Sequence, residues 1–152
     1  MAILFGWILS HSHFWKEHTN SRIVTFSTAA RKCETEAMIH QLMDYCRVES
    51  RLLVLDLEEE RRQYEGEWPS DQLTEPFLLN MEVEKRYAIC NHLMQKHCRD
   101  TATIFFPIVP PPDTPDQTDA ETYLRTLSTL SHSLPAPIVM VRGSRNVVTS
   151  EL

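Results

Sequence analysis

The densest group of potential metal ligands lies in one helix-like segment near residue 90. It comprises Cys90, His92, His97 and Cys98, and thiolates and imidazoles are the ligands that zinc prefers. At about 100° per residue on a helix, Cys90 and His97 lie close together, Cys98 lies at their edge, and His92 points almost away. The spacing therefore favours two core thiols and two histidines over a metal centre.

A second histidine group surrounds Trp15 and consists of His11, His13 and His18. Two histidines separated by one residue can bind a metal weakly, but the spacing fixes no acidic or thiol partner here. A polar connecting loop is the simpler interpretation. We therefore expect neither a metal nor a cofactor in this chain.

The strongest candidate for binding a polar ligand is the turn at Arg142, Gly143 and Ser144, which follows a predicted strand. Phosphate loops need a glycine-rich turn in front of a helix, and the chain has only three glycines, none in that pattern. A polar turn or an interface position is the competing interpretation of these three residues.

The sequence offers less support for a catalytic site than for a site that binds a polar ligand. The sequence has no serine in a nucleophile elbow and no acid–base pair placed by spacing. We therefore expect a domain that acts by contact and is not an enzyme. The alternative is a nucleotide-binding α/β module, which would hold its ligand beyond the strand ends near Asp56, Pro107 and Arg142.

Length and charge narrow the class of protein. A chain of 152 residues corresponds to one domain. Its net charge of −6 argues against a nucleic-acid partner and against general attraction to anionic lipids. The apolar run at 1–9 is far shorter than the roughly 20 residues of a membrane span. The four cysteines fall in helix-like segments, which indicates a cytosolic chain with reduced thiols.

The predicted elements alternate between strand and helix. Apolar runs predict strands at 2–9, 22–26, 51–57, 103–108 and 138–141, and a short edge strand at 146–152. Helical periodicity predicts helices at 33–48 and 82–98 and a third helix that includes 123–130, whereas 11–21 is expected to be a loop. This order predicts an α/β fold with a mainly parallel sheet of about five or six strands and helices on both faces.

Each predicted helix has one apolar face. In the first helix this face consists of Ala37, Met38, Leu42, Tyr45 and Cys46. In the second it consists of Val83, Tyr87, Cys90, Leu93, Met94 and His97, and in the third of Tyr123, Leu124, Leu127 and Leu130. Thr118 or Asp119 is expected to cap the third helix. The charged stretch 58–81, which contains Gly66, Pro69 and Pro76, is expected to be a surface excursion.

The order of motifs in the second half of the chain resembles the C-terminal domain of the cation–chloride cotransporters, solute carrier family 12. The resemblance rests on a turn at His97, Cys98 and Ala102, prolines at 107 and 110–112, a helix with Tyr123, Leu124 and Leu127, and a strand ending in Val141, Arg142 and Gly143. A looser match occurs at Trp15, Lys16, Arg22 and Ile23. The chain departs from the family in having cysteine at position 98, where serine is usual, a brief stretch at 58–81 and no transmembrane region. The brief stretch and the terminal sequence VVTSEL are most similar to the divergent cotransporter-interacting or orphan branch.

The resemblance implies that residues 1–152 are part of a C-terminal regulatory domain on the cytoplasmic face of a membrane transporter. It implies a fold similar to universal stress proteins. The implied partners are the transmembrane region of the parent transporter and a second copy of the domain. It also implies that this chain is a fragment without transport activity of its own.

Overall fold

The first half of the protein is a parallel strand pair joined by a helix. The computed structural model describes residues 8–9, 11–63, 82–111 and 116–142. After the short helix α2 (His13–His18), strand β1 (Arg22–Ser27) leads through the turn η1 (Ala29–Arg31) into helix α3 (Lys32–Cys46) and strand β2 (Arg51–Asp56). The two strands pair in parallel along their whole length, from Arg22 opposite Arg51 to Ser27 opposite Asp56. Their β-branched and leucine side chains suit a sheet that is covered on both faces.

The second half repeats this arrangement with shorter strands. Helix α4 (Leu57–Arg62) follows β2 directly. Helix α6 (Val83–His97) leads into strand β3 (Ile104–Pro107), and helix α7 (Gln117–Ser131) leads into strand β4 (Ile138–Val141). Strands β3 and β4 pair in parallel, with Ile104 opposite Ile138.

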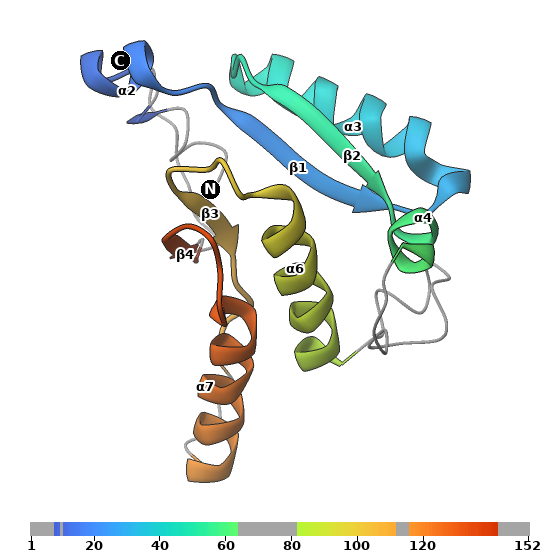
Figure 1. The fold of residues 1–152 in the computed structure, drawn as a ribbon, viewed down its shortest axis with the longest axis vertical. Coiled ribbons are helices and arrows are strands. Elements are labelled where there is room, and N and C mark those ends of the chain that lie inside the picture. The colour runs from blue at the N-terminus through green and yellow to red at the C-terminus, as the bar shows by residue number, and fades with distance from the viewer. Residues whose placement is uncertain (1–7, 10, 64–81, 112–115, 143–152) are drawn as a thin grey trace.

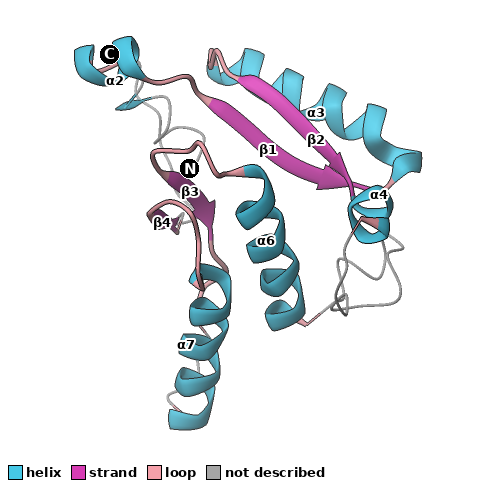
Figure 2. Ribbon diagram, in the orientation of Figure 1, coloured by secondary structure: helices cyan, strands magenta, loops and turns pink. Residues whose placement is uncertain are grey.

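Helices cover the β1–β2 pair from both sides. Figure 1 shows α3 on one side of this pair and α6 on the other, and Figure 2 shows α7 beside α6. Leu55 and Leu57 pack against Ile89 and Leu93 of α6. A second cluster lies between α6, α7 and the β3–β4 pair, with Leu130 fully buried in it. Helix α6 therefore carries apolar contacts to both halves of the molecule.

Further contacts also connect the two halves. Phe26 of β1 packs against both apolar clusters. At the start of β1, Arg22 Nη2 donates a hydrogen bond of 2.7 Å to the carbonyl oxygen of His97, the last residue of α6. The amino end of β1 is thereby tied to the connection between α6 and β3.

The predicted α/β class with parallel strands is confirmed, but the predicted sheet is not. Within the part of the chain that the structure describes, four strands form two separate pairs rather than one sheet of five or six. The strand predicted at 2–9 is wrong where it can be seen, because Ile8 and Leu9 are helical, and the loop predicted at 11–21 contains α2. The edge strand predicted at 146–152 lies outside the described residues.

The predicted apolar face of α6 is confirmed, since Tyr87, Cys90, Leu93 and Met94 are all buried. The predicted face of α3 is wrong: Met43 is the residue that α3 buries, whereas Met38, Leu42 and Tyr45 are exposed. Periodicity alone locates an apolar face without saying which side the sheet will take.

Two further boundaries differ from expectation. Asp116 caps α7 in place of Thr118 or Asp119, and its Oδ1 accepts a hydrogen bond of 3.1 Å from the Thr118 amide. The start of the stretch 58–81 forms part of α4, where Glu60 is buried; residues 64–81 lie outside the described residues. None of the helices in the described ranges is long and apolar enough to cross a membrane.

Candidate functional site

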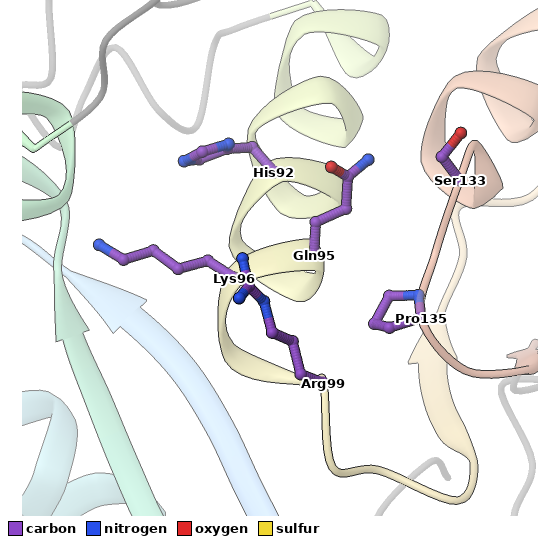
Figure 3. Close-up of a pocket in the computed structure, with 6 residues that line it drawn as sticks. All are labelled: His92, Gln95, Lys96, Arg99, Ser133 and Pro135. Carbon is purple, nitrogen blue, oxygen red and sulfur yellow. The ribbon is translucent and has the colours of Figure 1, made fainter.

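A cation-lined hollow lies on the surface near the last turn of α6. It has a volume of about 590 Å³ and is lined by His92, Gln95, Lys96, Arg99, Ser133 and Pro135. Figure 3 shows His92 and Lys96 pointing from α6 away from Ser133 and Pro135. Gln95 lies on the side of α6 that is nearer to these two residues, which belong to the turn that follows α7. Positions 92, 96 and 99 share one side of the segment because they are spaced by four and three residues.

The lysine of the hollow is already engaged by α4. Lys96 Nζ donates to Glu60 Oε2 at 2.8 Å and to Gln63 Oε1 at 2.7 Å. His97 Nε2 lies 2.9 Å from the other carboxylate oxygen of Glu60. The Glu60 side chain is only 9% exposed, so this carboxylate is a buried group held by two neighbouring residues of α6.

These contacts also set the titration of the cluster. Burial by itself would raise the pKa of Glu60, but the hydrogen bond from Lys96 and the positive charges of His97 and Lys96 outweigh burial and hold that pKa below its ordinary value. Burial lowers the pKa of His92, and the charge of Lys96 lowers it further. His92 is therefore mainly neutral at pH 7, which leaves Arg99 as the exposed cation of the hollow.

Two side-chain amides of α6 bind backbone carbonyl groups at the end of α7, next to the hollow. Asn91 Nδ2 donates to the carbonyl oxygens of Leu130 (2.9 Å) and His132 (2.8 Å), at the end of α7. Gln95 Nε2 donates to Asn91 Oδ1 at 2.8 Å and to the His132 carbonyl at 3.2 Å. These two amides satisfy carbonyl groups that the last turn of a helix leaves without partners.

The electrostatics of this region do not favour an anionic ligand. The C-termini of α6 and α7 meet at the hollow, and helix C-termini carry partial negative charge. The cations there stabilise the helix ends and the Glu60 carboxylate. The hollow also lies where α6 and α7 lead into β3 and β4, at the amino ends of the strands, whereas α/β folds bind nucleotides beyond the carboxyl ends.

At the carboxyl ends of β2 and β3, polar groups cap a helix and hold a loop in place. Asp56 Oδ1 accepts hydrogen bonds from the amides of Glu58 (2.9 Å) and Glu59 (3.4 Å), so Asp56 is the N-cap of α4. Beyond β3, the amide of Val109 donates to the Tyr87 hydroxyl, and the Tyr123 hydroxyl donates to the carbonyl of Val109, both at 2.9 Å. The path of the loop after β3 is therefore fixed by tyrosines from α6 and α7.

Arg142 is exposed directly after β4. Gly143 and Ser144, the other two residues of the predicted polar-ligand turn, lie outside the described residues. Pro107, the last residue of β3, is also exposed. The strand ends near Asp56, Pro107 and Arg142 thus present one capping carboxylate, one exposed proline and one exposed guanidinium.

The cysteine and histidine group of α6 is dispersed by the fold. Cys90 and Cys98 lie in the apolar cluster around Leu130, and burial raises the pKa of Cys90 to about 12. His97 faces Glu60 and His92 faces the hollow. Within the described ranges, no three His, Cys, Asp or Glu side chains are placed to hold a metal ion. In α2, His13 pairs with Glu17 at 3.4 Å and His18 packs against Phe14.

The apolar face predicted for α3 lies in solvent rather than in the core. Met38, Leu42 and Tyr45 are 59%, 41% and 87% exposed, and their spacing of four and three residues puts them in one row along the helix. We call these three residues the α3 stripe. Periodicity had indicated this apolar face, but the choice between the core and solvent depends on tertiary packing.

Comparison of the chain with protein-family models, with curated proteins and with solved structures gave no match in any of the three.

Proposed function

We propose that this chain is a regulatory and dimerisation domain from the cytoplasmic side of a cation–chloride cotransporter-like membrane transporter. It acts by contact, without catalysis, and has no transport activity on its own. The observation that carries the proposal is the α3 stripe, which exposes three large apolar side chains in a row along one helix. Rows of this kind mark surfaces that bind other proteins.

The arrangement of the described elements supports the same proposal. α/β folds of the universal-stress-protein type, which the resemblance implies, also combine parallel strands with helices on both faces. Asp56 at the end of β2 caps α4, and Lys96 of the α6 hollow pairs with Glu60. The described residues therefore support a surface that binds another protein better than they support a ligand-binding pocket.

The proposal is tested on the transporter itself. In a full-length cation–chloride cotransporter, deletion of the segment equivalent to 101–152 should reduce dimerisation, surface delivery or chloride-dependent flux. The present chain, expressed separately, should co-purify with the transmembrane region of that transporter in detergent. A deletion that leaves all three properties unchanged, together with no co-purification, would rule the proposal out.

A matched pair of variants tests whether transporter function requires the folded core of this domain. Leu130→Ala weakens the core around α7, whereas Leu124→Ala changes an exposed leucine on the same helix. Transporter function should suffer with the first variant and not with the second. Calorimetric titration with ATP distinguishes the nucleotide-binding alternative, which would require heat of binding at or below millimolar nucleotide.

A further inference from the structure

The end of β3 and the loop that follows it carry a row of exposed prolines. Pro107, Pro110 and Pro111 are exposed, whereas Ile108 and Val109 between them are half-buried and pack against the apolar cluster between α6, α7 and the β3–β4 pair. The segment therefore presents its proline rings to solvent and its branched side chains to the core. We call the three exposed prolines the proline ridge.

The sequence favours the polyproline II conformation in this ridge. A proline ring fixes its own φ at about −65°, and a residue in front of a proline is kept out of the helical region. Val109 and Pro110 each precede a proline, and the described residues 108–111 contain no turn or bend. Polyproline II has three residues per turn, so Pro107 and Pro110 are placed on the same side of the segment.

The internal contacts of this loop use its backbone N–H groups. The Ile108 amide donates to the Val141 carbonyl at 3.1 Å, and the Val109 amide donates to the Tyr87 hydroxyl at 2.9 Å. Prolines have no amide hydrogen. Within the described stretch 107–111, every N–H group is thus bonded inside the protein. Addition of a partner strand, which needs such donors, is disfavoured, whereas recognition of the proline rings is not.

The path of the ridge is also fixed before any partner binds. The Tyr123 hydroxyl donates to the Val109 carbonyl at 2.9 Å, so α6 and α7 both hold residue 109. A segment that is already ordered loses little conformational freedom on binding, which lowers the cost of association. The aromatic-lined grooves of SH3-type domains bind proline segments in this preformed extended conformation.

The two ends of the ridge differ in charge. Pro107 lies opposite Val141 in the β3–β4 pair, so the exposed Arg142 follows β4 next to the amino end of the ridge. Asp116 lies beyond the carboxyl end, where its carboxylate caps α7. A guanidinium forms strong charge-assisted hydrogen bonds with a carboxylate. The ridge therefore suits a groove that carries acidic side chains at the end that meets Arg142.

We propose that the proline ridge and Arg142 form a docking surface for an SH3-type domain, whose aromatic groove packs on the proline rings and whose acidic side chains pair with the guanidinium. This surface shares no residue with the α3 stripe, and the inference does not rest on the proposed function. The ridge is far smaller than the roughly 800 Å² per partner of a standard interface. The complex should therefore be weak and reversible.

Calorimetric titration of the full chain with a panel of purified SH3 domains that differ in groove charge tests this surface. A domain with an acidic groove should bind with a Kd of about 1 mM or below, and Pro110→Ala should weaken it at least about tenfold. Pro135→Ala, at an exposed proline after α7, is the matched control and should leave the Kd unchanged. Arg142→Glu should weaken binding, whereas Arg99→Glu, at another exposed arginine, should not.

Competition provides a second measurement that needs no variant of this chain. A proline-rich peptide that fills the groove of the same SH3 domain should displace the chain, because both require the same aromatic side chains. Absence of binding by every domain of the panel at about 1 mM overturns the inference. A complex that survives Pro110→Ala, or that persists when the peptide saturates the groove, also overturns it. These outcomes leave the proposed function untouched, since that is tested by dimerisation and flux.

Discussion

Helices α3 and α6 have the same length, 15 residues, yet they are used in opposite ways. α6 buries six residues, because it lies between the β1–β2 pair on one side and α7 with the β3–β4 pair on the other. α3 buries only Met43 and leaves its apolar row in solvent. The comparison teaches that an apolar helix face is evidence of a contact without showing that the contact is internal.

The largest expected contrast is in thiol reactivity. In a chain carrying Cys46→Ser and Cys98→Ser, Cys33 on α3 is exposed, whereas Cys90 on α6 is buried with its pKa raised to about 12. Since Cys90 reacts only when the structure opens, its labelling by a disulfide reagent at pH 8 should be slower by on the order of 1,000-fold. Equal rates in native buffer would mean that the α6 side is as open as the α3 side; equal rates in denaturant serve as the control.

Truncating a buried leucine of α7 should destabilise the protein far more than truncating an exposed leucine of the same helix. Leu130 is fully buried beside α6, so Leu130→Ala should lower the free energy of unfolding by about 2–5 kcal/mol. Leu124→Ala, at an exposed position of the same helix, should change it by less than about 0.5 kcal/mol. Urea unfolding followed by circular dichroism measures both values, and similar losses would show that α7 is rotated from the described orientation.

The amide contacts between α6 and α7 should rank next. Asn91→Ala removes the donor to the Leu130 and His132 carbonyl groups and should destabilise the protein by about 1–3 kcal/mol. Gln95→Ala should cost less, because Gln95 is more exposed and its bond to His132 is longer, at 3.2 Å. A larger loss for Gln95→Ala in urea unfolding would contradict this order.

The Glu60 cluster should add a pH-dependent increment. Because the folded-state pKa of Glu60 is depressed, its contribution is present above its ordinary pKa of 4.5 and is lost as the pH falls through the folded value. Glu60→Gln should therefore lower the unfolding free energy at pH 7 by about 1–2 kcal/mol, with the difference from wild type shrinking below pH 4.5. Melting curves between pH 7 and pH 3 provide the measurement, and a difference that grows in acid would reverse the assigned sign.

The smallest effect is expected on the α3 stripe. At concentrations where the chain is monomeric, Met38→Ser and Tyr45→Ser should each change the unfolding free energy by less than about 0.5 kcal/mol, because both side chains are already in water. Met43→Ala on the same helix should cost about 2–5 kcal/mol. Thermal unfolding of dilute protein distinguishes them, and a large loss for Met38→Ser would place the stripe inside the core.

The sequence predicted the positions of the helices and strands better than it predicted which of their side chains are buried. Strands β1 to β4 and helices α3, α6 and α7 follow from local apolar periodicity, and the buried face of α6 follows because two layers cover it. The orientation of α3 could not be predicted, since the pattern offers two adjacent faces and only packing on β2 selects Met43. The prediction that Leu124 belongs to the buried face of α7 is wrong for the same reason. Leu124 has helical spacing, but it is exposed.

Long-range polar contacts were also outside the reach of the sequence. Glu60 belongs to a charged run that reads as solvated, and its burial depends on Lys96 and His97, more than 30 residues later. Its pairing could have been suspected only from the adjacent cations at the end of α6. Asp56, by contrast, is a signal that a capping rule could have found, because it directly precedes a helix rich in glutamate.

The two tyrosine bonds to Val109 have a consequence for protein engineering. Because the loop after β3 is fastened at Val109 by α6 and α7, its path up to that point does not depend on the length of chain that follows. Doubling the length of a flexible loop costs only about 0.6 kcal/mol in closure entropy. A reporter peptide inserted after Pro111 would start from a fixed attachment point, and both helices would keep their positions around it.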